Sequence, residues 1–218
     1  MEINWESQVL SSVSKVIPKL SCLEIDIDKL HEVAAELSED SFSINYEGNT
    51  NTVPKEYIRK TMLINTLNFV FTDFLTSVKY KIENYSDTDA MVYQIDKALD
   101  QGIPLTQGRF MRDMNLKEFK TLFTGNIVMP MADEKVKILN NVGDILVTKY
   151  GGDWINFIDD GPKKLYDNGK GLVERLVRDF KRFDDHSIFE NEKVYFLKLA
   201  QLAFWGIHLS LIHISEPT

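Results

Sequence analysis

The chain has 218 residues, of which 44% are hydrophobic and 27% charged, so it is long enough to bury a substantial core in one domain. Its formal net charge of −8, with no block of Lys and Arg, argues against a broad basic surface for nucleic acid or anionic lipid, but not against a nucleotide in a basic pocket. The one cysteine, Cys22, excludes an internal disulfide and a multi-cysteine zinc site, and it suits a reducing compartment.

The sequence contains no segment typical of export or of a membrane span. Its first ten residues, MEINWESQVL, lack the basic flank and the apolar centre of a secretory signal. The longest nearly uncharged run, residues 199–214, is interrupted by polar side chains and falls short of the roughly 17–25 apolar residues that a spanning helix needs. We therefore expect a soluble, cytoplasmic protein.

Helical periodicity dominates the first half of the chain. Apolar residues three and four positions apart predict a helix over residues 5–17, which Pro18 ends. A second helix follows the Asp-Thr-Asp sequence of residues 87–89, which can cap its N-terminus, and it ends before Gly102 and Pro104.

The second half continues the pattern. Asn115 and Glu118 have the spacing of a capping box and predict the start of a helix. The clearest helix covers residues 132–150 and ends at Gly151. Two polar, turn-rich stretches are expected to connect helices: residues 38–57 and 159–171. The predicted fold class is all-α, a single helical domain with at most a minor β element.

Few residues indicate chemistry when they are taken one at a time. The four histidines, His31, His186, His208 and His213, lack the spacing of metal ligands. Asp184 and Asp185 can form a carboxylate pair in which one member has a raised pKa, as a general acid needs, but such a pair more often caps the segment that follows it.

The stretch TLNFVFTDF places an amide among aromatic rings. Asn68, flanked by Phe69, Phe71 and Phe74, can offer a donor and an acceptor to the edge of a flat heterocycle held between rings. The alternative is that the rings belong to the core and Asn68 satisfies a backbone group. The spacing alone favours this alternative.

Lys198 lies in an apolar run, EKVYFLKLAQLAFWGIH, which the periodicity predicts as one central helix. On that helix Lys198, Gln201, Trp205 and His208 share a narrow polar stripe. A lysine that faces a cavity is a handle for an anion or a substrate. Alternatively, Lys198 reaches solvent along a thin exposed stripe. The sequence leaves both interpretations open.

Four blocks together resemble the queuosine salvage protein family, the queuosine 5′-phosphate N-glycosidases. They are LINTLNFVF, KALDQGIPLT, MPMADEKVKILNNVGDILVTKYGG and SIFENEKVYFLKLAQL, in the family's order and spacing from about residue 25 to about residue 201. The resemblance implies a helical fold like that of helical DNA glycosylases. It also implies hydrolysis of the bond between queuine and ribose 5′-phosphate, so that queuine is salvaged for tRNA modification, with no metal or organic cofactor.

The resemblance also implies roles for particular residues. Asn68 with Phe69 or Phe71 would form the wall against the base. Lys198, in the Lys-x-Ala-Gln block, would be the active-site lysine that contacts the ribose or the catalytic carboxylate. Asp185 would be a supporting acid. The substrate would be a small molecule, queuosine 5′-phosphate or queuosine, with no direct nucleic-acid or membrane partner.

The chain departs from the family pattern in three places. Thr72 stands where a tryptophan commonly follows the aromatic block, and the aspartate common near Gly206 is missing. The family's catalytic aspartate is expected beyond the end of this chain. The last ten residues, LSLIHISEPT, resemble a translated sequencing adapter, so we expect residues 1–208 to be the N-terminal two-thirds of a glycosidase domain and residues 209–218 to be an artefact.

Two other functions fit the same sequence. One is a non-catalytic helical module that binds a nucleoside or a protein, which would bind ligand without hydrolysing it. The other is an N-glycosidase for a different modified nucleoside, which would differ in the wall near Phe71 and Thr72. As written, the chain is expected to lack activity because it lacks the catalytic aspartate. The sequence leaves the oligomeric state open.

Overall fold

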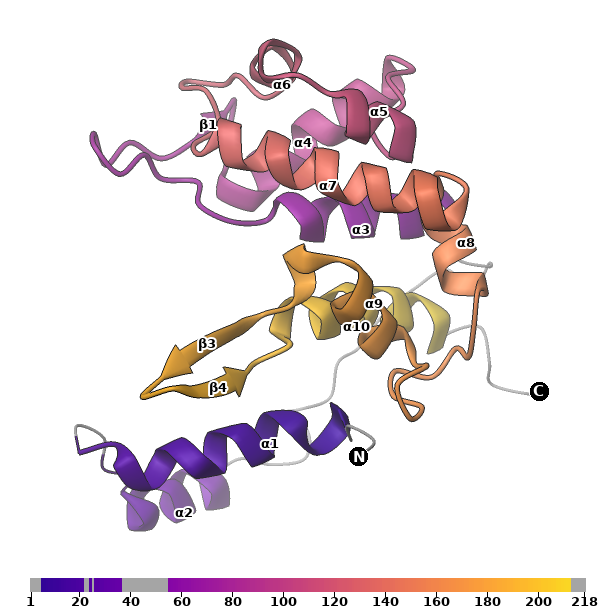
Figure 1. Cartoon of the computed structure of the whole chain (residues 1–218). Helices are drawn as coiled ribbons and strands as arrows, with labels where there is room; N and C mark the ends of the chain where they lie inside the picture. The colour runs from indigo at the N-terminus through magenta and orange to yellow at the C-terminus, as the bar shows by residue number, and fades with distance from the viewer. Residues whose placement is uncertain (1–4, 22–23, 25, 37–54, 213–218) are drawn as a thin grey trace.

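A computed structural model describes residues 5–21, 24, 26–36 and 55–212 of the chain (Figure 1). Cys22 and most of the predicted connection 38–57 lie outside the described residues. The helices are α1 (Trp5–Val16), η1 (Ile17–Lys19), α2 (Ile27–Glu36), α3 (Lys55–Leu67), α4 (Asp87–Asp100), α5 (Gly108–Asp113), α6 (Leu116–Leu122), α7 (Ala132–Tyr150), α8 (Trp154–Asp159), α9 (Leu172–Asp179), η3 (Lys181–Phe183) and α10 (Lys198–Ile212). None of these described helices is long and apolar enough to cross a membrane.

The β structure in the described part of the chain consists of two antiparallel hairpins and two isolated bridges, Thr72 with Lys79 and Thr124 with Val128. β1 (Lys81–Ile82) pairs with β2 (Tyr85–Ser86), and β3 (His186–Phe189) pairs with β4 (Glu192–Tyr195). The prediction of an all-α domain with a minor β element is therefore confirmed.

Helix boundaries set by local signals lie close to where the sequence places them. α1 ends at Val16, and the 3₁₀ turn η1 carries Pro18. The predicted capping box opens α6: the Asn115 side chain accepts from the Glu118 amide, and the Glu118 carboxylate accepts from the Asn115 amide, each at 3.0 Å. Gly151 ends α7 with φ +61°, in the left-handed region that glycine adopts without strain.

The prediction of one continuous helix across EKVYFLKLAQLAFWGIH is wrong. Residues 192–195 of this run form strand β4, and α10 begins only at Lys198. Leu197 has φ +52°, a left-handed conformation that a helix cannot continue through. Apolar residues continue through the run because β4 packs against α1 and α10 packs against the core, so the periodicity does not distinguish the strand from the helix.

α5 and α7 cross very closely at two glycines. A Cβ on Gly143 of α7 would lie 2.2 Å from the amide nitrogen of Arg112, and one on Gly108 of α5 would lie 2.9 Å from the Cβ of Leu146. Nδ2 of Asn140 in α7 stabilises the crossing by sharing its two protons among three carbonyl oxygens at the end of α5, at 2.8–3.0 Å. The crossing therefore depends on the absence of side chains at both glycines.

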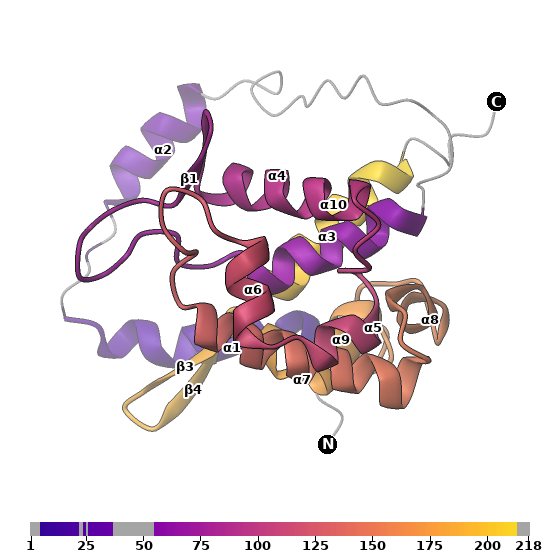
Figure 2. The same ribbon diagram turned by 90° about the horizontal axis from the view of Figure 1, so that it is seen from above.

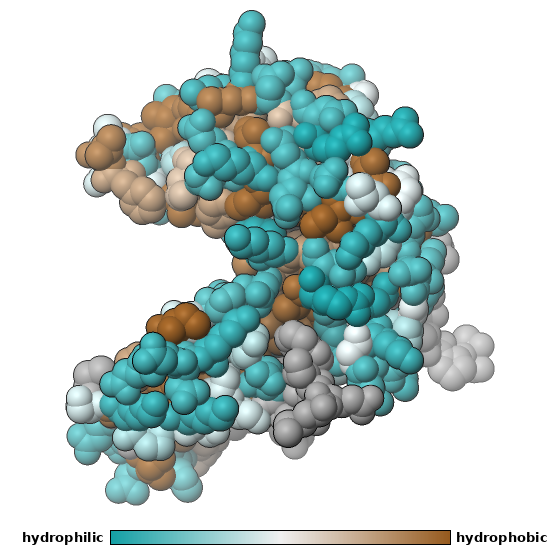
Figure 3. All heavy atoms as spheres, in the orientation of Figure 1, coloured by the Kyte–Doolittle hydropathy of each residue, from teal (hydrophilic) through white to brown (hydrophobic). Residues whose placement is uncertain are grey.

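The elements form two layers joined along one side of the molecule. α3 to α7 make up one layer, and α9, α10 and the β3–β4 hairpin make up the other, with α1 beside the hairpin (Figures 1 and 2). The amide of Tyr195 donates to the Ser12 hydroxyl at 3.0 Å and ties β4 to α1. The space-filling view shows a deep cleft between the two layers, open on the side where the hairpin projects (Figure 3).

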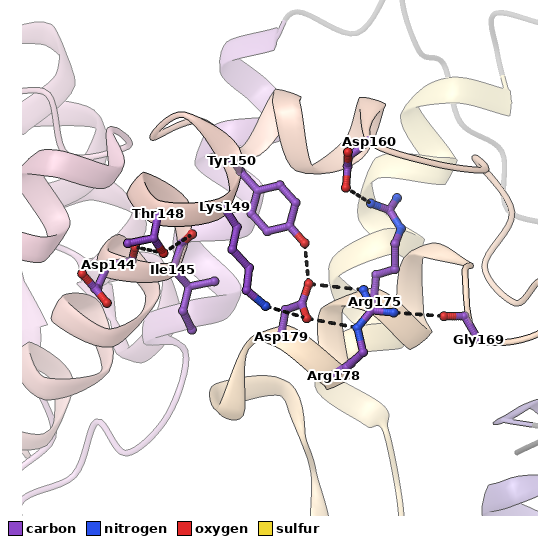
Figure 4. Close-up of polar contacts among 10 residues, drawn as sticks. All are labelled: Asp144, Ile145, Thr148, Lys149, Tyr150, Asp160, Gly169, Arg175, Arg178 and Asp179. Carbon is purple, nitrogen blue, oxygen red and sulfur yellow. Dashed lines mark hydrogen bonds and ion pairs between the residues drawn. The ribbon is translucent and has the colours of Figure 1, made fainter.

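A cluster of charges fastens the end of α7 to the end of α9 (Figure 4). Asp179 accepts from Lys149 Nζ at 3.1 Å, from Arg178 Nε at 3.0 Å and from the Tyr150 hydroxyl. Burial alone would raise the pKa of Asp179, but these three donors outweigh burial and lower the pKa to about 2. The ionised carboxylate is therefore the form that holds the two layers together at this point.

We expect Gly143→Ala to destabilise the protein by about 3 kcal/mol or more, because the added methyl meets backbone rather than a flexible side chain. The matched control is Gly206→Ala in α10, where the nearest atom would be 3.5 Å away and the change should fall within about 1 kcal/mol of neutral. Urea unfolding followed by circular dichroism measures both. Equal effects of the two substitutions would contradict the close crossing.

We expect acid to remove the contribution of Asp179. Because its pKa is lower in the folded chain than in the unfolded chain, it contributes about 2 kcal/mol above pH 4, and this is lost as the pH falls towards 2. Asp179→Asn should lower the free energy of unfolding at pH 7 and flatten its dependence between pH 4 and pH 2. The control is Asp159→Asn, which alters an exposed pair with Lys163. An unchanged acid profile in the Asp179 variant would contradict the assignment.

Candidate active site

The predicted aromatic wall lies where the chain leaves α3. The helix ends at Leu67, and the next residues turn away into an extended loop on the underside of the first layer (Figure 1). Val70 has φ +46°, a strained conformation for a β-branched residue that persists only where its surroundings hold it. A buried side chain bonds to the Val70 carbonyl oxygen and holds this part of the loop in place.

That group is Lys135, a fully buried lysine in the first turn of α7. Its Nζ donates to the carbonyl oxygens of Phe69 at 2.6 Å, Val70 at 3.1 Å and Pro130 at 2.9 Å. An ammonium has three protons to donate, so all of its donors are satisfied. Lys135 therefore fixes the loop after α3 against the start of α7.

Opposing effects act on the protonation of Lys135. Burial, and then the positive charge of Arg182, lower the pKa of Lys135 to about 7. The three carbonyl oxygens favour the charged ammonium, as do the rings of Phe69 at 4.0 Å and Phe71 at 5.5 Å from Nζ. No carboxylate of the described residues pairs with this cation.

Arg182, on the turn η3, approaches the same ring from the second layer. Its Nε donates to the carbonyl oxygen of Thr66 at 2.8 Å, and its guanidinium carbon lies 4.6 Å from the centre of the Phe69 ring. Phe69 is therefore in contact with two cations, one from α7 and one from η3. The cluster of Phe69, Lys135 and Arg182 joins the two layers.

Asn68 faces α4 with one end of its amide. Its Oδ1 accepts from the Thr88 hydroxyl at 2.9 Å, while its Nδ2 donates to none of the described residues. Phe71 packs against the core cluster with part of its surface exposed, whereas Phe74 is 75% exposed on the outer loop. Phe69 and Phe71 thus share a contact with Lys135, Asn68 bonds to α4, and Phe74 is exposed on the loop.

Asp185 and Lys198 are brought together by the backbone. The Asp185 carbonyl oxygen accepts from the amides of Phe196 at 2.9 Å and Leu197 at 3.3 Å, immediately before Lys198. Lys198 is exposed, as are Gln201 and Trp205 on its predicted stripe; the side chain of His208 lies outside the described residues. In this chain, then, the lysine reaches solvent, the second of the two interpretations of the stripe.

Asp184 and Asp185 have different surroundings and do not work as a pair. Asp184 lies 3.1 Å from Nδ1 of His186 and 3.6 Å from Nζ of Lys193, whereas the charge of Asp185 acts on Arg182. Neither caps a helix that follows, because the next element is strand β3, and Asp184 is instead the C-cap residue of η3.

Lys135 and Arg182 are the site residues that the sequence reasoning missed. For Lys135 a signal was present: positions 135, 139, 142 and 146 follow the spacing of the apolar face of α7, so a lysine on that face indicates a buried charge with partners. No comparable signal marks Arg182, because its partners Thr66 and Phe69 are more than 100 residues away in the sequence.

The fold is a mostly helical domain with a cleft between its two layers, and a cluster of aromatic rings and two basic side chains joins the layers. The family model described as queuosine salvage protein matches residues 44–211, about three-quarters of the chain, and the chain belongs to that family. The match includes all the site residues described above and ends three residues into the tail LSLIHISEPT.

Several similar proteins carry the name queuosine 5′-phosphate N-glycosylase/hydrolase, among them proteins from Mus musculus, Bos taurus and Sphaerobacter thermophilus. The one from Mus musculus is 30% identical over 146 residues, which are 64% of this chain and 42% of the relative. The one from Bos taurus is 26% identical over 173 residues, 77% of this chain and 50% of the relative. The one from Sphaerobacter thermophilus is 23% identical over 198 residues, 89% of this chain and 60% of the relative. The chain thus spans about half the length of these curated relatives.

We expect Lys135→Met, which keeps the length of the side chain but removes the ammonium, to lower the free energy of unfolding by about 2–4 kcal/mol, because three buried carbonyl oxygens lose their donor. Lys137→Met is the control two residues along α7, where an exposed pair with Glu134 is lost and the effect should stay within about 0.5 kcal/mol. Chemical denaturation compares them. A Lys135 variant as stable as the control would show that the buried ammonium does not hold the loop.

Proposed function

We propose that this chain is part of an N-glycosidase that hydrolyses queuosine 5′-phosphate to queuine and ribose 5-phosphate. The observation that supports this most is membership of the queuosine salvage family across residues 44–211, joined to the shared name of its relatives. The partner is then a small nucleotide, and a cytoplasmic location fits the salvage of a base for tRNA modification.

In the proposed reaction the carbon–nitrogen bond between ribose and base breaks, water adds to the anomeric carbon, and the base leaves with a proton as free queuine. The transition state has oxocarbenium character, so a carboxylate near the anomeric carbon stabilises it or attacks it. A 7-deaza base lacks the ring nitrogen at which purines are usually protonated. Orientation of base and ribose therefore supplies more of the acceleration.

The contacts of the wall refine the roles of its residues. Phe69 already contacts two cations, so in this proposal it supports Lys135 and Arg182, and Phe71 provides the ring against the base. Asn68 offers its Nδ2 to an acceptor on the base edge, because its Oδ1 is held by Thr88.

The ribose end of the proposed site lies where Asp185 and Lys198 come together. Lys198 contacts the ribose or the catalytic carboxylate, and Asp185 is a supporting acid. The catalytic aspartate belongs to the part of the parent protein that follows residue 208. In the same proposal residues 1–208 are the glycosidase portion of the chain, and residues 209–218 are encoded by a sequencing adapter.

The test is release of free queuine from queuosine 5′-phosphate, measured by chromatography. We expect none from the 218-residue chain, turnover by a gene completed at its 3′ end, and a loss of at least 100-fold in kcat for Lys198→Ala in the completed protein. Lys163→Ala, which alters an exposed pair with Asp159, is the control and should keep full activity.

Each contrary outcome has a distinct meaning. Turnover by the 218-residue chain would overturn the placement of the catalytic aspartate. Saturable binding without hydrolysis by the completed protein would favour a binding module. Faster release of a base other than queuine would favour a glycosidase for another modified nucleoside. An active Lys198→Ala variant would remove that lysine from the site.

A further inference from the structure

Arg182 is held in place by one edge of its guanidinium while the opposite end has no partner. Nε donates to the Thr66 carbonyl oxygen at 2.8 Å, and the guanidinium lies over the Phe69 ring. The terminal nitrogen Nη2 is buried and donates to no acceptor among the described residues. A buried donor without an acceptor is costly, because it has given up its hydrogen bonds to water.

The charges near Arg182 favour an anion as the missing partner. Lys135 and Arg182 are both cations in contact with one ring, and neither forms an ion pair with a carboxylate of the described residues. The charge of Asp185 acts on Arg182 and offsets part of this excess. Two cations and one carboxylate leave a local excess of positive charge in a chain whose net charge is −8.

The two cations have different freedom to bind a ligand. The Nζ protons of Lys135 are all committed to carbonyl oxygens, so Lys135 contributes charge and position. Arg182 keeps Nη2 without an acceptor at the end of a planar fork, a geometry that can bind phosphate oxygens. The turn η3, which carries Arg182, lies between α9 and β3 near the inner end of the cleft (Figures 1 and 3).

We propose that Arg182 binds the phosphate of a nucleoside monophosphate in the cleft. This inference rests on the proposed function and deepens it: Arg182 selects the 5′-phosphorylated nucleotide over the nucleoside, and Lys135 and Phe69 hold its guanidinium in position. A dianionic phosphate supplies both the acceptor that Nη2 lacks and the negative charge that the pair of cations lacks.

The first experiment titrates the 218-residue chain with inorganic phosphate and follows the ³¹P line width at constant ionic strength. We expect saturable binding that weakens at least tenfold in Arg182→Gln and about threefold in Arg182→Lys, which keeps the charge but loses the fork. Arg109→Gln, at an exposed arginine on α5, should leave binding unchanged. Binding that fails to saturate in the wild-type chain, or that survives in Arg182→Gln, overturns the proposal.

The second experiment measures kcat/KM of the completed protein with queuosine 5′-phosphate and with queuosine. Arg182→Lys should lower the ratio of the two values by at least fivefold, and a ratio that stays unchanged contradicts the proposed selectivity. Circular dichroism checks that each variant folds, and Arg182→Lys carries both experiments if Arg182→Gln does not fold. Phosphate binding that depends on Arg182 without queuine release would leave the phosphate site standing and the glycosidase function overturned.

Discussion

The arrangement of the cleft depends on one buried ammonium. Lys135 binds three carbonyl oxygens, two of them on the loop after α3 and one just before α7. Without that cation the left-handed backbone at Val70 would lose a hydrogen bond that offsets its strain. The Phe69 ring would also lose its contact with Nζ. Since Arg182 of the second layer contacts the same Phe69 ring, this cluster is one of the places where the two layers are joined.

The helical elements could be predicted because their signals are local. A capping box and a glycine in the left-handed region act within a few residues, and both the start of α6 and the end of α7 follow from them. The β3–β4 hairpin could not be predicted in the same way. It depends on positive φ at Glu190 and Asn191 and on packing against α1, and neither shows in an apolar run such as EKVYFLKLAQ.

The candidate site also contains residues that local sequence indicates and residues that only tertiary packing brings together. Asn68, Phe69 and Phe71 are close in sequence, so the resemblance of that one stretch to the family is enough to propose them together. Arg182 enters the site only because η3 folds back onto the end of α3, a contact that spans 116 residues. Periodicity does not indicate the contacts of Arg182, since tertiary packing brings its partners to it.

The positions of the charges constrain how a nucleotide can lie in the proposed reaction. An oxocarbenium-like transition state carries positive charge at the anomeric carbon, and a buried cation beside that carbon would raise the barrier. Lys135 and Arg182 must therefore lie towards the phosphate or the base, and a carboxylate must lie towards the ribose. Asp185 is linked to both ends of the proposed site: its charge acts on Arg182, and its backbone is hydrogen-bonded to the residues just before α10. An exposed Lys198 near it can hold a carboxylate close without placing another buried cation at the reacting carbon.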